Sequence, residues 1–202
     1  GEIAWRKGNE SDAIRLGESA LKALPKEEVM LGARVRAYMA ESHRKDGDHG
    51  KALKRYEEMM QTDPGLVRRL GISIPVRLSV SSGEPVSDRA LTLFKRSPRL
   101  RITENDAFSL TFTRTGDRTK ACLETNAKVQ LSCVELERWK NMGPKKNETE
   151  NDSDLAARTV DELHKRAFSG KFGLTPDELK LFDGTQSLAQ RAQRDAVKKA
   201  VE

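Results

Sequence analysis

Two stretches of this chain, residues 8–25 and 47–64, repeat the same pattern and constrain the fold more than any other feature. In each stretch a glycine precedes a proline by 17 positions, and an alanine follows that glycine by five positions: Gly8, Ala13 and Pro25, then Gly47, Ala52 and Pro64. Repeated spacing of this kind indicates stacked supersecondary units. Because a proline pushes the preceding residue out of the helical region, each stretch predicts a turn and then a helix that ends at the proline.

The residues before Gly47 predict a partner helix for the second stretch. Over residues 33–45 one buried helical face is predicted at Val35, Tyr38, Met39 and Ser42. The helix after the turn has its own apolar stripe: Ala52, Leu53, Tyr56, Met59 and Met60. Residues 1–70 are therefore predicted to form a helical segment of two helix-turn-helix repeats.

These residues resemble the tetratricopeptide repeat (TPR) family, which has small residues where helices touch, a glycine at the turn and a proline at the end. The matching positions are Gly8, Ala13, Ala20 and Pro25, then Ala40, Gly47, Tyr56, Met59 and Pro64. Arg36 and Met39 depart from the family's tryptophan and leucine, and Pro25 to Pro64 spans 39 residues instead of about 34. In the family's phase Gly1 falls inside a helix, so we expect the chain to begin within a repeat.

The resemblance implies a peptide-binding groove lined by the first helix of each repeat. The family's most specific binding mode clamps a terminal carboxylate with a lysine and an asparagine. Ala37 and Glu41 occupy the corresponding positions, so this clamp is not expected. Arg34, Arg44 and Lys45 are candidates for attracting an acidic peptide, and ordinary exposed helix charges are the alternative interpretation.

In residues 71–140 the spacing of apolar residues changes from a helical period to a two-residue alternation. This segment is predicted to form a small basic α+β domain. Residues 72–80 alternate as a strand, and Pro75 indicates an edge strand or a bulge because it cannot donate to a ladder. Ser87 is expected to cap a helix that runs to residue 96 and covers the sheet. Residues 100–102 predict a short strand. Residues 72–135 resemble bacterial envelope α+β domains, and the strand-helix-strand unit resembles the opening of the curli-secretion lipoprotein family, which implies an envelope location.

The rest of this domain predicts a meander of three strands with one buried face. If Thr115 pairs with Arg118, Phe112 faces Ala121 and Leu110 faces Leu123. A second loop at residues 126–128 would pair Thr125 with Val129. The fold class is therefore α+β: TPR-like helical repeats, a small antiparallel-rich sheet with one covering helix, and C-terminal helices.

That register also predicts the state of Cys122 and Cys133. It places Cys133 on the apolar face and Cys122 on the opposite face, too far apart for a disulfide. We therefore expect two free thiols, and only a bulge between the strands would allow a bond. The redox compartment stays undecided.

Charge is concentrated in the middle of the chain. Residues 66–121 hold 11 basic and 5 acidic side chains and account for the whole net charge of +6. The candidate basic patch for an anion or nucleic acid consists of Lys95, Arg96, Arg99 and Arg101. Nucleic-acid binding is disfavoured because the helical pattern buries the adjacent aromatic, Phe94.

After a polar linker at residues 141–153, residues 154–202 predict a C-terminal helical segment, including two helices beyond residue 174. No catalytic motif or metal-ligand spacing accompanies His43, His49 and His164. We expect no enzyme, no cofactor and no metal. The leading hypothesis is a protein-interaction scaffold, with a structural subunit of an envelope or motility assembly and an anion or nucleic-acid binder as alternatives. A periplasmic or envelope location is favoured over a cytoplasmic one, and no residue names the protein partner.

Overall fold

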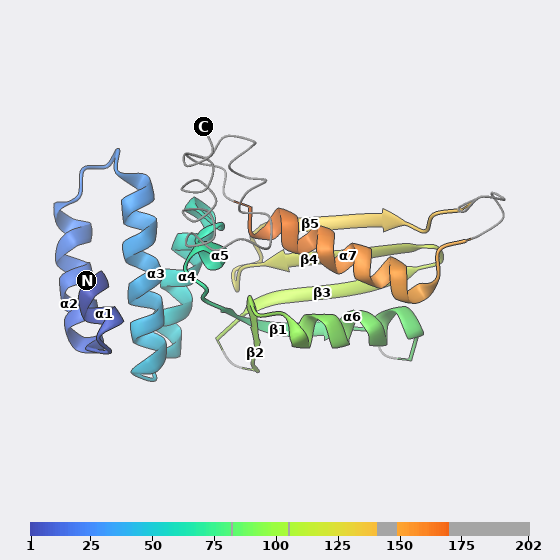
Figure 1. Ribbon diagram of the computed structural model, residues 1–202, viewed down its shortest axis with the longest axis horizontal. Coiled ribbons are helices and arrows are strands. Elements are labelled where there is room, and N and C mark those ends of the chain that lie inside the picture. Colours follow the sequence, from blue (N-terminus) through green and yellow to red (C-terminus); the bar gives the residue numbers. More distant parts are fainter. Residues whose placement is uncertain (82, 105, 141–148, 170–202) are drawn as a thin grey trace, which may run out of the picture.

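The computed structural model describes residues 1–81, 83–104, 106–140 and 149–169. Helices come first and a five-stranded sheet follows, so the molecule is a mixed α and β structure with the two parts at opposite ends (Figure 1). Among the described helices, none is long and apolar enough to cross a membrane. In chain order the elements are α1 (Glu2–Arg6), α2 (Glu10–Ala23), α3 (Val29–Lys45), α4 (His49–Thr62), α5 (Leu66–Arg69), β1 (Ile74–Val80), α6 (Pro85–Arg96), β2 (Leu100–Ile102), β3 (Phe108–Thr115), β4 (Arg118–Glu124), β5 (Gln130–Glu137) and α7 (Asp152–Ala167).

The turns between α1 and α2 and between α3 and α4 have the same geometry. Gly8 and Gly47 adopt positive φ angles of 72° and 84°, a conformation that is unfavourable for residues with a Cβ atom. The amide of the next residue, Asn9 or Asp48, donates over 2.9 Å to a carbonyl five positions earlier. The Asn9 and Asp48 side chains then cap the following helices by accepting a backbone amide three residues on. The two helix-turn-helix units are therefore equivalent at their turns.

Small residues allow these helices to pack closely. Ala37 and Ala40 of α3 and Ala52 of α4 are buried where the two helices meet. Gly17 of α2 is required by packing, because a Cβ atom there would lie 2.6 Å from Cγ of Met39. Helix α3 begins four residues before the predicted start, at Val29.

The sheet has the order β2-β1-β3-β4-β5. Strand β1 is parallel to β2 and β3, whereas β3, β4 and β5 form an antiparallel meander. The sheet is therefore mixed, and the expected antiparallel-rich sheet is too simple. The parallel pairs arise because α6 and the loop after β2 return the chain in the same direction.

Pro75 lies in an inner strand, so the expectation of an edge strand or bulge is wrong. Ile74 donates its amide to the carbonyl of Arg99, and the carbonyl of Val76 accepts from Thr103, so the neighbours of Pro75 make the bonds toward β2. The ladder with β3 starts only at Val76. The missing donor of Pro75 therefore falls just before a partner strand begins.

Two helices cover one face of the sheet, instead of the single expected helix. Figure 1 shows α6 and α7 side by side on the sheet. Helix α6 contacts β2 and β3, and α7 contacts β4 and β5. Helix α6 begins at Pro85, and Ser87 is buried inside it instead of capping it. The expected helices beyond residue 174 and most of the linker lie outside the described residues.

The predicted β3–β4 register is confirmed, but the β4–β5 register is shifted by a bulge. Thr115 pairs with Arg118, and Leu110 with Leu123. Between Leu123 and Glu124 the pairing to β5 jumps from Ser132 to Gln130. Cys122 therefore faces Cys133 directly, and the two form a disulfide. The expectation of free thiols is wrong for this reason.

One hydrophobic core runs from the helical part into the sheet. It begins at Ala33 on α3, continues through α4 and α5, and ends at Phe168 after α7. Polar bonds also cross the junction: the Glu57 carboxylate on α4 accepts the Asn126 amide over 2.9 Å. The helical part is therefore attached to the sheet by packing and by hydrogen bonds.

Candidate functional site

The predicted partner-groove residues divide into accessible and buried ones. Arg34 is exposed, donates from Nε to the Tyr38 hydroxyl over 2.7 Å, and forms an ion pair with Glu2 at 3.1 Å. This hydrogen bond raises the pKa of Arg34, and burial raises the pKa of Tyr38. Ala37 and Glu41 are 0% and 6% exposed, so a partner cannot reach them. They are not part of a surface groove.

The other two predicted cations are held by intramolecular partners. The Arg44 guanidinium forms an ion pair with Glu41 at 2.8 Å. The Lys45 ammonium lies 2.9 Å from Glu10 and over the ring of Trp5. Both therefore stabilise the helical units, and Arg34 is the predicted groove cation that lies beside a cavity.

A cavity of about 230 Å³ lies between α1, α2 and α3. Its floor on α2 is made of small residues, and its wall on α3 combines apolar side chains with Arg34 and Tyr38. Glu2 closes the side toward α1. The cavity lining consists of Gly1, Glu2, Ala13, Gly17, Ala20, Leu31, Arg34, Val35 and Tyr38, which we call the α1–α3 groove.

Exposed apolar side chains concentrate on the same helices. Of the seven large apolar residues exposed within the described ranges, four belong to α1, α2 and α3: Ile3, Leu16, Val29 and Leu31. Leu31 lines the groove, and Leu16 lies one helical turn from Ala20. Apolar exposure beside a concave site is typical of an interaction surface.

The predicted basic patch does not form a single surface. Lys95 and Arg96 are exposed at the end of α6. Arg99 lies over the ring of Phe168, and Arg101 is directed toward Ser73, with its Nη1 atom 3.3 Å from the Ser73 carbonyl. The four cations are therefore divided between a helix end and the junction with the helical part.

Arg101 belongs to a buried network at that junction. The Tyr56 hydroxyl is buried, donates to the Glu41 carboxylate, and lies within hydrogen-bonding reach of the Arg101 guanidinium. Burial, and then the negative charge of Glu41, raise the pKa of Tyr56. The network connects α3, α4 and β2 through hydrogen bonds between buried side chains, so we assign it a structural role.

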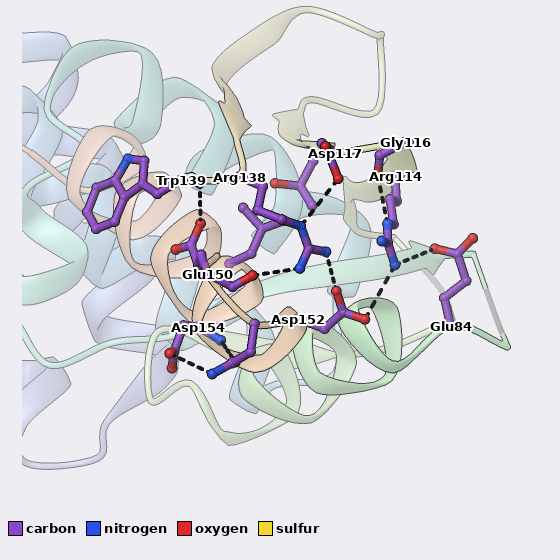
Figure 2. Close-up of polar contacts among 12 residues, drawn as sticks. Glu84, Arg114, Gly116, Asp117, Arg138, Trp139, Glu150, Asp152 and Asp154 are labelled. Carbon is purple, nitrogen blue, oxygen red and sulfur yellow. Dashed lines mark hydrogen bonds and ion pairs between the residues drawn. The ribbon is translucent and has the colours of Figure 1, made fainter. Parts of the chain in front are cut away.

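A second charged cluster lies at the far end of the sheet (Figure 2). Arg138 pairs with Asp152 and donates to the Glu150 carbonyl over 2.6 Å. The Glu150 carboxylate accepts both a fork from Arg158 at 2.7 and 2.8 Å and the Trp139 amide. The bond with Arg158 lowers the pKa of Glu150. Asp152 and Glu150 are each paired with an arginine, so this cluster fastens α7 to the end of β5.

The histidines do not form a catalytic or metal centre in the part of the chain that the structure describes. His43 is buried, His49 is exposed, and the ring of His164 bonds to the Val160 carbonyl and the Ser97 hydroxyl. No group of three or more histidine, cysteine, aspartate or glutamate residues is placed to hold a metal within the described ranges. A second cavity, of about 280 Å³, lies beside Pro75, Arg101 and Asp106.

Sequence reasoning identified Arg34 but missed the residues that form the groove around it. Leu31 and Val35 lie one turn apart and flank Arg34, a spacing that indicates an apolar wall interrupted by one charge. Glu2 and Tyr38 complete the polar side. The missed signal was Leu31, because the helix was predicted to begin at residue 33, whereas Val35 and Tyr38 were assigned to its buried face.

Comparisons with protein-family models, with curated proteins and with solved structures give no match. The function is therefore inferred from the groove, its charges and its surroundings.

Proposed function

We propose that this chain is a non-enzymatic protein-interaction module whose helical units, built on a TPR-like plan, dock a partner protein. The single observation that supports this most is the α1–α3 groove, where a cavity lies beside Arg34 and exposed apolar side chains. The sheet and its two helices act as the support that holds these units, through the core shared with α4 and α5.

The disulfide between Cys122 and Cys133 supports an oxidising location for this module. Disulfides persist in secreted and periplasmic proteins and are rare in reducing compartments. We therefore propose a periplasmic or envelope-associated scaffold. This location is also what the alternative function, a structural subunit of an envelope assembly, requires.

Site-specific photo-cross-linking tests the docking function. A photoreactive residue at Leu31, inside the groove, is expected to capture a partner from an extract of the source cells. The matched control carries the photoreactive residue at position 129 on the sheet side. Val129 is 52% exposed and Leu31 is 46% exposed, so the two positions are similarly accessible. Competition by unlabelled wild-type protein, but not by a Leu31→Ala and Ala20→Glu variant, is the expected result.

Equal capture from both positions, or equal competition by the groove variant, would contradict the proposal. The variant's circular dichroism and unfolding midpoint must match the wild type, because Ala20 is only partly buried. A partner captured solely through the sheet would favour the structural-subunit alternative.

A further inference from the structure

The second cavity, of about 280 Å³, lies at the junction between the helical part and the sheet, apart from the α1–α3 groove. One wall is the first turn of α4, through His49 and Ala52. Another is the start of the sheet, where Pro75 and Arg101 are register partners in the ladder between β1 and β2 and therefore share one face. All lining residues belong to residues 49–106, so these walls are interior segments of the chain. We call this space the junction cavity.

The third wall is the chain between β2 and β3. These two strands lie on opposite sides of β1, and Ile102 at the end of β2 and Phe108 at the start of β3 both pair with Val76. The connection therefore crosses β1 at the level of Val76. It is held there because the Arg77 guanidinium donates to the Glu104 carbonyl over 3.1 Å. The cavity is thus bounded by segments that other contacts fix in place, as in a pre-formed ligand site.

Two ionised side chains of opposite sign line the junction cavity. Arg101 is half-buried, and its hydrogen-bond partners are neutral: the carbonyl and hydroxyl of Ser73 and the hydroxyl of Tyr56. Asp106 is exposed, in the loop after β2. Among the residues that the structure describes, no side chain forms an ion pair with Arg101 or with Asp106. A guanidinium has five N–H donors, so donors remain for a ligand carboxylate.

This pair of charges limits the chemistry of the ligand. A simple anion would meet the carboxylate of Asp106, and a simple cation would meet the guanidinium of Arg101. A molecule with one carboxylate and one ammonium satisfies both, with its carboxylate at the half-buried Arg101 and its ammonium at the exposed Asp106. The cavity volume lies just below the roughly 300–1,000 Å³ of pockets for drug-sized ligands, so the molecule is small.

We propose that the junction cavity binds a small zwitterion, an amino acid or a dipeptide, whose carboxylate contacts Arg101 and whose ammonium contacts Asp106. Ala52 and Pro75 face its aliphatic carbons. The site goes beyond the proposed docking function and does not depend on it. Because the ligand contacts both α4 and the sheet, its binding stabilises the junction between the two parts of the molecule.

The test follows ligand titrations of the full chain by ¹H–¹⁵N NMR, which detects weak binding at individual amides. The ligands are L-valine, the dipeptide Ala-Ala, valine amide, which lacks the carboxylate, N-acetylvaline, which lacks the ammonium, and inorganic phosphate. The proteins are the wild type, Asp106→Asn, and Asp161→Asn as a matched control, since Asp161 is 65% exposed and pairs with Lys165 on α7. Asparagine tolerates the φ of 38° at position 106, so Asp106→Asn keeps the backbone conformation.

Valine or Ala-Ala is expected to shift the amides of Ala52 and Thr103 equally in the wild type and in Asp161→Asn. The tighter of the two identifies an amino-acid site or a dipeptide site. Valine amide and N-acetylvaline are expected to bind about tenfold more weakly than valine, because each loses a charge-assisted hydrogen bond. In Asp106→Asn, valine is expected to bind as weakly as N-acetylvaline.

No shift with either zwitterion, or shifts confined to amides outside the junction cavity, would overturn the proposal. Equal binding of the two capped ligands and valine, or unchanged binding to Asp106→Asn, would also overturn it. Phosphate that binds as tightly as valine would mean a simple anion site and would contradict the zwitterion. Valine amide tests the contact with Arg101 on the wild-type protein, so no substitution in the network around Tyr56 is needed. Cross-linking at Leu31 tests the docking function separately from all these outcomes.

Discussion

At the scale of single residues, Tyr56 links the helical part to the sheet most directly. Its ring is completely buried, and its hydroxyl lies between the Glu41 carboxylate and the Arg101 guanidinium. A buried carboxylate without its donor retains the cost of desolvation. The Tyr56 hydroxyl therefore contributes to stability mainly by donating a hydrogen bond to the buried Glu41 carboxylate.

We predict that Tyr56→Phe lowers the free energy of unfolding by about 1–3 kcal/mol, because it removes the hydroxyl donor of the buried Oε1 atom of Glu41, while the ion pair of Glu41 with Arg44 remains. Tyr38→Phe is the matched control. It loses one hydrogen bond from Arg34, whose exposed guanidinium can turn to water, so a loss below about 1 kcal/mol is expected. Urea unfolding followed by circular dichroism measures both, and equal losses would contradict the structural role given to Tyr56.

His164 makes stability depend on pH. Its Nδ1 atom lies 2.8 Å from the Val160 carbonyl and must donate, so Nε2 of the neutral ring accepts from the Ser97 hydroxyl. Burial, and then the nearby charge of Arg99, lower the pKa of His164. Burial also lowers the pKa of His43.

As pH falls, His164 and His43 become protonated in the unfolded chain before they do so in the folded chain. The free energy of unfolding is therefore expected to decrease as pH drops below about 6.5 toward the lowered pKa values of the folded state. Chemical unfolding at pH 7.5 and pH 5.5 measures the loss. His164→Gln is expected to reduce the difference between the two pH values, with His43 accounting for the remainder. An unchanged difference in the variant would show that His164 is not desolvated in this way.

At the scale of elements, the β4–β5 hairpin shows how one irregularity changes chemistry. The turn was predicted correctly, since the Thr125 amide donates to the Val129 carbonyl over 2.9 Å. The bulge beyond it shifts the register, and that shift brings Cys122 and Cys133 together. The disulfide joins the inner strand β4 to the edge strand β5.

Replacing both cysteines by serine is expected to destabilise the protein by about 3 kcal/mol. The disulfide joins residues 11 positions apart, and closing a loop of this length lowers the conformational entropy of the unfolded chain. Guanidinium unfolding of the double variant gives the value. Wild-type protein treated with dithiothreitol should unfold at the same denaturant concentration as the variant. A variant as stable as the oxidised wild type would mean that the strand pairing alone fixes this edge.

The helices and the β3–β4 hairpin could be predicted from sequence because each depends on local signals. Gly47, Pro64 and the alternation around Phe112 report turns, ends and buried faces without knowledge of the rest of the fold. The bulge in the β4–β5 pairing and the packing of a second helix on the sheet could not be predicted, because both depend on contacts between distant segments. The same limit applies to Glu41, which was expected to line a groove but is buried and bonded to Tyr56, 15 residues away.

At the scale of the whole molecule, the groove lies at one end and the sheet at the other (Figure 1). A docking surface on helices alone would be marginal, since short stacked units need neighbours to bury their faces. Here α4 and α5 supply that contact through a core continuous with the sheet. The sheet therefore stabilises the helical units, and binding energy at the groove need not order them.

This arrangement predicts that the helical part and the sheet unfold together. The chain has two tryptophans, Trp5 on α1 and Trp139 just after β5, so each reports on one end. In the single-tryptophan variants Trp139→Phe and Trp5→Phe, fluorescence in urea should give coincident midpoints, matched by circular dichroism. Arg101→Ala combined with Glu57→Ala removes polar bonds at the junction and is expected to separate them, with Trp5 reporting the earlier transition. Separate midpoints while Arg101 and Glu57 are intact would mean that the helical units fold independently of the sheet.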